Sequence, residues 1–235
     1  MEKQIDITQL EEKIISVLTQ QKADFIRFVD VSGFSIKQNR GLPNAILFGI
    51  ALPRLYLQEV AKVPDYVKTM IEQNKMESDE LYLTELKTDS ISNQMAEKLV
   101  SEGFNAYAHS DDNLIATGVF DGIYEETPLP HKTIAVLSGI GWIGKNNLLV
   151  TPEYGSALCL GVVLTDAPLE TILCEPPIPK CGNCNVCMKI CEKQVLKGKT
   201  WSSSVSRDEI VDVYECSTCL KCLVHCPNTQ RYCKQ

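Results

Sequence analysis

The sequence predicts an α+β protein with two domains, and two observations lead to this prediction. Residues 1–172 alternate between helical and extended hydrophobic patterns, which is typical of helices packed on a sheet. Residues 173–235 carry a duplicated run of closely spaced cysteines instead, which indicates a small module built around its cysteines. A length of 235 residues fits one or two domains, and a hydrophobic share of 44% is ordinary for a globular chain.

The first hundred residues predict a helix, two strands and a long helical stretch, in this order. Thr8-x-x-Glu11 is a capping box, and it precedes a helix expected to extend to about Gln21. Strands are expected at 25–29 and at 45–52, and the second is so apolar that both of its faces should be covered. A helical stretch with interruptions then extends from Pro53 to about Gly103.

The middle of the chain alternates short elements with proline-rich segments. Two prolines within 124–131 exclude a helix there, and three prolines within 170–180 predict a stiff linker to the C-terminal module. The other expected elements are a strand at 106–108, a loop at 111–113, a helix at 132–138 and a hairpin of 148–150 with 156–165.

Both halves of the cysteine run have the spacing C-x2-C-x2-C-x3-C. In bacterial ferredoxins with this spacing, three cysteines of one motif bind one [4Fe–4S] cube and the fourth binds the other cube. Crossed ligation then predicts two ligand sets. The first cluster would be held by Cys181, Cys184, Cys187 and Cys226, and the second by Cys216, Cys219, Cys222 and Cys191. Pro227 follows Cys226, as is usual in such motifs, whereas Glu192 follows Cys191.

Two other uses of cysteine compete with iron–sulfur ligation. Zinc also binds C-x2-C pairs, but three cysteines at this pitch, twice over, exceed what a tetrahedral ion needs. Disulfides would require an oxidising compartment. The spacing therefore favours clusters, and no role is assigned to the cysteines outside the motifs, Cys159, Cys174 and Cys233.

Composition limits the partners and the location of the protein. The net charge of −7 and the pI of about 5.1 argue against a nucleic-acid-binding face, which normally needs clustered Lys and Arg. The N-terminus has no apolar stretch like that of a signal peptide. The longest apolar run, Ala157–Leu164, is far shorter than the ~20 residues of a membrane span. A cytoplasmic protein without membrane association is expected.

A glycine segment, Gly139-x-Gly141-x-x-Gly144-Lys145-Asn146, formally matches a dinucleotide-binding fingerprint. The fingerprint needs a strand before it and a helix after it, and here the expected order is reversed. The three glycines instead favour close approach of backbone amides to a ligand, and a purely structural turn stays open as the alternative.

The residues around this segment carry a resemblance to a known family. Residues 131–150, Glu153-Tyr-Gly-Ser156 and Leu160-Gly-x-x-Leu-Thr-Asp166, followed by the cysteine motifs, strongly resemble epoxyqueuosine reductase. This family depends on cobalamin and iron–sulfur clusters and is related to reductive dehalogenases. The resemblance covers roughly 45–227. It implies a nitroreductase-like corrinoid-binding domain over 1–172 and a two-cluster ferredoxin-like module over 173–235, in a short form without the family's C-terminal helical-repeat domain.

The resemblance also implies roles for particular residues. Glu125 stands where the family has an aspartate that donates a proton to the substrate, and Lys132 stands where it has an arginine. No D-x-H-x-x-G motif occurs, so cobalamin would bind without a protein histidine below the metal. The corrinoid-binding residues implied are Gly139, Gly141, Trp142, Gly144, Lys145 and Asn146.

Two functions follow as hypotheses. In the first, an epoxyqueuosine reductase-like oxidoreductase passes electrons from two [4Fe–4S] clusters to a corrinoid, which reduces a small molecule. In the second, the chain is an electron-transfer protein that serves a partner's corrinoid or flavin, and flavin bound to this chain is a further alternative. A ferredoxin or flavodoxin is the expected electron donor. Transfer RNA is expected to be an unlikely partner, because the charge is acidic and Val162 replaces a family glutamate.

Overall fold

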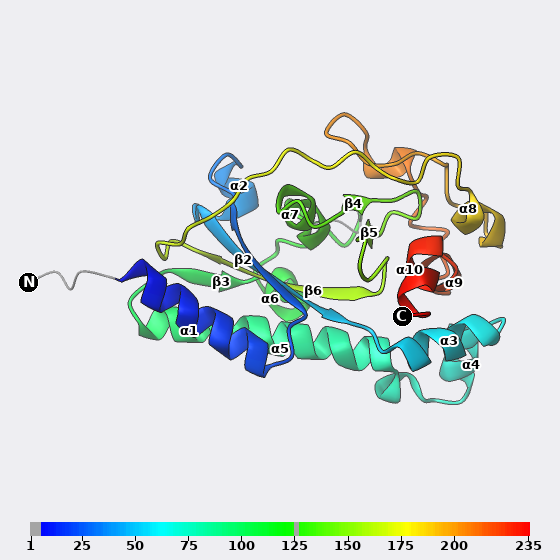
Figure 1. Cartoon of the computed structure of the whole chain (residues 1–235), viewed down its shortest axis with the longest axis horizontal. Coiled ribbons are helices and arrows are strands. Elements are labelled where there is room, and N and C mark those ends of the chain that lie inside the picture. Colours follow the sequence, from blue (N-terminus) through cyan, green and yellow to red (C-terminus); the bar gives the residue numbers. More distant parts are fainter. Residues whose placement is uncertain (1–5, 125–126) are drawn as a thin grey trace, which may run out of the picture. The chain divides into compact units, whose positions relative to one another are not determined.

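The computed structural model describes residues 6–124 and 127–235 (Figure 1). The chain forms two compact units, each assembled from three stretches of sequence. The sheet unit comprises Met1–Ile50, Glu85–Ser138 and Leu160–Leu173, and the cysteine unit comprises Ala51–Thr84, Gly139–Cys159 and Cys174–Gln235. The expected domains, 1–172 and 173–235, were each continuous in sequence, and their assignment as corrinoid-binding and ferredoxin-like parts stays a prediction.

A four-stranded sheet organises the sheet unit. Its strand order is β1 (Phe25–Asp30), β2 (Asn44–Ala51), β6 (Leu158–Thr165) and β3 (Ala106–Ala108). The register pairs Phe28 with Ile46 and Tyr107 with Leu164 in antiparallel ladders. Six consecutive residues of β2 are buried, so this strand is central and covered on both faces as expected.

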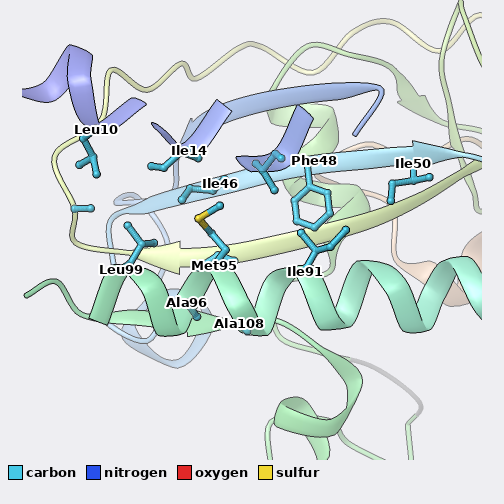
Figure 2. Packing of buried hydrophobic residues seen from close by; sticks show 13 residues of the cluster. Leu10, Ile14, Ile46, Phe48, Ile50, Ile91, Met95, Ala96, Leu99 and Ala108 are labelled. Carbon is cyan, nitrogen blue, oxygen red and sulfur yellow. The ribbon is translucent and has the colours of Figure 1, made fainter. Parts of the chain in front are cut away.

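Two helices, α1 (Ile7–Gln20) and α5 (Glu80–Ser101), cover one face of this sheet (Figure 1). Figure 2 shows how their apolar side chains meet alternate residues of β2, because successive residues of a strand point to opposite faces. The cluster contains Leu10, Ile14 and Leu18 of α1, Ile46, Phe48 and Ile50 of β2, and Ile91, Met95, Ala96 and Leu99 of α5. The cap of α1 differs from the prediction: the Asp6 carboxylate, rather than Thr8, accepts from the Gln9 amide at 3.2 Å.

The other face of the sheet is also covered. Ala45 and Leu47 of β2 have no exposed surface, and helix α7 (His131–Leu137) lies on this side in Figure 1 with Ile134 fully buried. The expected loop at 111–113 is instead the start of helix α6 (Asp111–Ala116), which follows Ser110 at its N-cap. Helix α2 (Ile36–Asn39) completes the unit between β1 and β2.

The long helical stretch expected from 53 to 103 is divided. It contains α3 (Arg54–Lys62), α4 (Tyr66–Glu72) and the 3-10 helix η1 (Met76–Ser78) before α5 begins. Asp79 separates these helices from α5. Its carboxylate accepts from the Tyr82 amide at 3.1 Å and so caps the first turn of α5. The same buried carboxylate accepts from the hydroxyl groups of Tyr56 and Tyr66, each at 3.0 Å, which fixes α3 and α4 beside it.

The predicted hairpin of 148–150 with 156–165 is wrong. Strand β5 (Leu149–Val150) pairs with β4 (Trp142–Ile143), and β6 joins the four-stranded sheet. The glycine segment therefore forms the hairpin with the residues that follow it. Where the hairpin was expected, Thr151 and Gly155 form an isolated bridge across the turn.

The C-terminal part of the cysteine unit consists of short helices. They are α8 (Val186–Ile190), the 3-10 helix η2 (Arg207–Glu209), α9 (Lys221–Val224) and α10 (Pro227–Tyr232). Helix α8 of the first motif packs on α9 of the second, and an isolated bridge joins Leu196 to Val211 between them. Throughout the described residues, every helix is too short or too polar to span a membrane.

Candidate metal centre

The thiols of the two motifs gather in two groups within the cysteine unit. The side chain of Cys187 interacts electrostatically with the thiols of Cys226, Cys181 and Cys184. The side chain of Cys222 interacts in the same way with those of Cys219, Cys216, Cys187 and Cys191. The first group contains three cysteines of the first motif and Cys226. The second contains three cysteines of the second motif with Cys191 and also Cys187, so each group includes the four cysteines that crossed ligation predicts for it.

Burial changes the chemistry of the two central thiols. Burial and, to a smaller extent, the neighbouring cysteines raise the pKa of Cys187 to about 11 and the pKa of Cys222 to about 12. Because only the thiolate binds metal, iron has to displace these protons when it binds. Thiols are the donors that a [4Fe–4S] cube takes, so the two groups fit such a cube by their chemistry. The fit is not one of geometry, because within the described residues no group of three or more His, Cys, Asp or Glu side chains is arranged to hold a metal ion.

An apolar cluster lies against cysteines of both motifs. Val195, Leu196 and Val211 are buried, and Cys187, Cys191 and Cys222 pack against them. The two backbone segments that carry these residues pair on either side of the Leu196–Val211 bridge, where Lys197 N donates to Ile210 O at 2.8 Å and Asp212 N donates to Val195 O at 3.0 Å. This apolar shell reduces the exposure of these three cysteines to water, a factor that tunes cluster potentials. The spacing of the cysteines gave no indication of it.

The residue that replaces the usual proline has a partner. Glu192, directly after Cys191, forms an ion pair with Lys221, which stands between Cys219 and Cys222 of the second motif. Asp65 of the segment before α4 lies 3.6 Å from the same ammonium group. Glu192, the residue that departs from the ferredoxin pattern, thus forms an ion pair that connects the two motifs. The departure itself could be seen in the sequence.

The glycine segment lies directly beside the cysteine motifs, in the same unit. A Cβ atom at Gly144 would lie 2.8 Å from Asn146 Oδ1 and 3.5 Å from the sulfur of Cys181. A Cβ atom at Gly141 would lie 2.3 Å from the carbonyl oxygen of Val150. The glycines at these two positions are therefore explained by close packing of the chain against itself, the structural alternative that the sequence left open.

The corrinoid that the resemblance implies can be tested against the same segment. Trp142 is buried, and its Nε1–H has no hydrogen-bond partner among the described residues. An orphaned buried donor fits a segment that offers a hydrogen bond to a further group. Gly139 is exposed and has φ +75°, so it also leaves backbone accessible. The segment is thus compatible with a corrinoid, and its role in binding one stays a prediction.

Of the two expected catalytic residues, Glu125 lies outside the described residues and Lys132 belongs to the sheet unit. Lys132 is half-buried in the first turn of α7, next to His131, whose Nε2 lies 2.8 Å from the carbonyl oxygen of His109. Burial lowers the pKa of His109 to about 3, with His131 and Arg40 acting in the same direction, so this ring is neutral near pH 7. The catalytic assignment of Glu125 and Lys132 stays a prediction.

The fold is shared with two kinds of solved structure. A crystal structure of epoxyqueuosine reductase matches 96% of this chain and 67% of its own, with a TM-score of 0.56 and 16% identity. A catabolic reductive dehalogenase matches 92% of this chain and 30% of its own, with a TM-score of 0.63 and 17% identity. The chain is therefore a mixed α/β protein with the fold found in these two groups of reductases.

Curated relatives confirm the sequence resemblance to epoxyqueuosine reductase. The protein of that name from Listeria monocytogenes is 47% identical over 71 residues, which are 30% of this chain and 18% of the relative. The one from Pseudomonas aeruginosa is 35% identical over 81 residues, 34% of this chain and 22% of the relative. The matched segments thus span about a fifth of the length of these two relatives. No family model matches the chain.

One expectation about partners is wrong. Transfer RNA was expected to be an unlikely partner, yet a solved epoxyqueuosine reductase with this fold is bound to an epoxyqueuosine-modified stem loop of tRNA-Tyr. It matches 96% of this chain with a TM-score of 0.55. The error has a physical reason: net charge sums over the whole surface, whereas a local basic or hydrogen-bonding surface is enough to bind an RNA.

Proposed function

We propose that this chain is an iron–sulfur oxidoreductase, in which two [4Fe–4S] clusters deliver electrons to a bound corrinoid that reduces a substrate. The observation that carries the proposal is the pair of cysteine groups within one compact unit that also contains the glycine segment. The relatives and the structural neighbours are reductases, which supports a reductase function. We place the corrinoid in a nitroreductase-like domain on the strength of the same resemblance.

The clusters would be held by crossed ligation. Cys181, Cys184 and Cys187 with Cys226 would hold the first, and Cys216, Cys219 and Cys222 with Cys191 the second. The apolar shell of Val195, Leu196 and Val211 would cover one side of the ligand sets, at Cys187, Cys191 and Cys222. The Lys221–Glu192 ion pair would keep the motifs at a fixed separation. A ferredoxin or flavodoxin would supply the electrons.

When bound, a corrinoid supplies a cobalt centre that exchanges single electrons with the clusters and reduces the substrate. The glycine segment would contribute the Trp142 indole N–H and its backbone amides to hold the cofactor. Glu125 would donate the proton that the reduced substrate takes up, and Lys132 would stabilise the resulting carboxylate. These two roles follow from the resemblance alone.

The first substrate to test is an epoxide carried by a tRNA nucleoside, because a structural neighbour is bound to an epoxyqueuosine-modified stem loop. The second is a small halogenated phenol, because a dehalogenase neighbour is bound to 3-bromo-4-hydroxybenzoic acid. Turnover of the first alone would define an epoxide reductase, and turnover of the second alone a small-molecule reductase.

The optical spectrum of protein purified without oxygen, with cobalamin supplied during expression, tests the cofactor assignment. The proposal predicts iron–sulfur absorption together with a corrinoid band and turnover of one substrate class. Cluster absorption alone, with electron transfer to a partner's cofactor, would favour the electron-transfer protein. A flavin band in place of the corrinoid would contradict the cobalamin assignment.

A further inference from the structure

Two adjacent residues at the end of the glycine segment each contact a different cysteine motif. The Lys145 ammonium group donates to the carbonyl oxygen of Gly182 at 2.8 Å and to that of Cys184 at 3.0 Å. Both carbonyls belong to the loop that carries the first three cysteines of the first motif. The positive charge of Lys145 is therefore fixed on the ligand loop of the first cluster.

Asn146 contacts the other motif. Its side chain is buried, and Nδ2 donates to the carbonyl oxygen of Cys222 at 3.4 Å and to Ser156 Oγ at 3.2 Å. Its Oδ1 accepts from the Leu148 amide at 3.4 Å, which ties the side chain to the hairpin of β4 and β5. Each bond is long, but together they use both ends of a buried amide that has no access to water.

Lys145 differs from Lys221, the other lysine near the ligands, in whether a carboxylate compensates its positive charge. Lys221, beside the second motif, is paired with Glu192 and lies near Asp65, so its charge is compensated. Within the described residues, no carboxylate lies within the 4.0 Å of an ion pair from Lys145 Nζ. The charge of Lys145 is thus satisfied by two carbonyl groups and acts on the first motif without compensation.

From these contacts we infer that Lys145 and Asn146 are positioning residues of the two clusters, Lys145 for the first and Asn146 for the second. The inference rests on the proposed function, since it requires the clusters. A reduced cluster carries one more negative charge than an oxidised one, so a fixed positive charge nearby favours reduction. Lys145 therefore raises the reduction potential of the first cluster, and the glycine segment controls the redox properties of the cysteine motifs.

Redox titration followed by electron paramagnetic resonance tests the role of Lys145. In Lys145→Gln, which keeps a hydrogen-bond donor but removes the charge, one of the two reduction waves should move to lower potential and the other should stay. Lys145→Arg should keep both waves near their wild-type positions. Lys197→Gln is the matched control, because Lys197 Nζ also donates to a backbone carbonyl, that of Asp208 at 2.6 Å, outside the ligand loops.

Asn146→Asp tests the second half of the inference. The substitution keeps the shape of the side chain and brings a negative charge to the Cys222 carbonyl, so the other wave should now move to lower potential. Iron and sulfide are measured in every variant, so that cluster loss is separated from a shift. Wild-type protein without iron would overturn the proposed function and this inference together. Full iron content in Lys145→Gln and Asn146→Asp with both waves unmoved would overturn the inference alone.

Discussion

Phe48 and Cys222 show how differently the two units of this chain are stabilised. The Phe48 ring is fully buried in the sheet unit and lies over Gly161, where a Cβ atom would be 2.1 Å from it. Apolar packing of this kind holds the whole sheet unit together. Cys222 in the cysteine unit is surrounded by four other cysteines, and burial opposes the ionised form that metal needs.

The comparison teaches that the two units respond to different perturbations. The sheet unit has a continuous apolar cluster and needs no cofactor to bury it. The motif region of the cysteine unit has short helices and a small apolar cluster beside its cysteines, while α9 and α10 pack on α3 in a second apolar cluster. The bound clusters should therefore add to the stability of this region, which apolar packing alone does not provide. The predictions below separate these two sources of stability.

Loss of single cluster ligands should have the largest effect, and it should be confined to the cysteine unit. Cys226→Ser and Cys191→Ser should each lower the iron content from about eight to about four atoms per chain. Under crossed ligation, adding Cys181→Ser to Cys226→Ser should lose no further iron, because both cysteines hold the first cluster. Adding Cys216→Ser should remove nearly all of it.

The control for these variants is Cys174→Ser, which lies outside both motifs and should keep full iron content. The opposite pattern would show uncrossed ligation: further loss on combining Cys226→Ser with Cys181→Ser, and none on combining it with Cys216→Ser.

A core truncation should act on the sheet unit alone. Phe48→Ala should destabilise it by about 3–5 kcal/mol, because a buried ring is replaced by a cavity. Hydrogen exchange of the β2 amides in increasing denaturant measures this loss of unfolding free energy. The iron content of the variant should not change. Phe120→Ala, at a side chain that is 39% exposed, should cost less than about 1 kcal/mol. Loss of iron in Phe48→Ala would contradict the idea that the sheet unit and the cysteine unit are stabilised independently.

Acid should weaken the sheet unit through His109. Its folded pKa is lowered to about 3, so its contribution to stability is complete above the unfolded value of 6.5 and is lost as the pH falls toward 3. At pH 5 the loss should be roughly 2 kcal/mol. His109→Phe should reduce this pH dependence of β2 exchange and leave the part due to His131, whose pKa burial also lowers, whereas His225→Gln in the cysteine unit should leave it unchanged. His131 and Arg40 are the charged or titratable groups that act on His109.

The smallest effect is expected from a single hydrogen bond in the cysteine unit. Thr229 is fully buried in α10, and its Oγ1 accepts from the Ser156 amide at 3.0 Å. Thr229→Val leaves that amide unpaired and should cost about 1 kcal/mol while retaining the clusters. Thr229→Ser keeps the acceptor and should cost less. Loss of iron in Thr229→Val would show that α10 holds the clusters more directly than the comparison assumes.

Much of the sheet unit could be predicted, because its signals are local. The apolar run of β2 and the periodicity of the first helix depend on neighbours in sequence. Two predictions failed where the deciding partner is distant. Ser110 and Asn93 hold the start of α6, and the β5 residues pair with β4 rather than β6. Sequence pattern cannot select between two possible partners of a short strand.

The ligand sets of the candidate site were predicted from the spacing of the cysteines, because the geometry of the cube dictates that spacing, and they stay a prediction. The environment of the ligands was not visible. Lys145 and Asn146 were expected at a corrinoid, and their observed contacts are with the cysteine motifs. These contacts join residues 37 and 76 positions apart, and nothing in the local pattern encodes such a distance.

Iron and acid-labile sulfide analysis of protein purified without oxygen tests the central claim most directly, namely that the cysteine unit is built around two crossed [4Fe–4S] clusters. The account predicts about eight iron atoms and about eight sulfides per chain, and β2 exchange unchanged after the iron is removed by chelation. Near-zero iron with one or two zinc atoms per chain would contradict it.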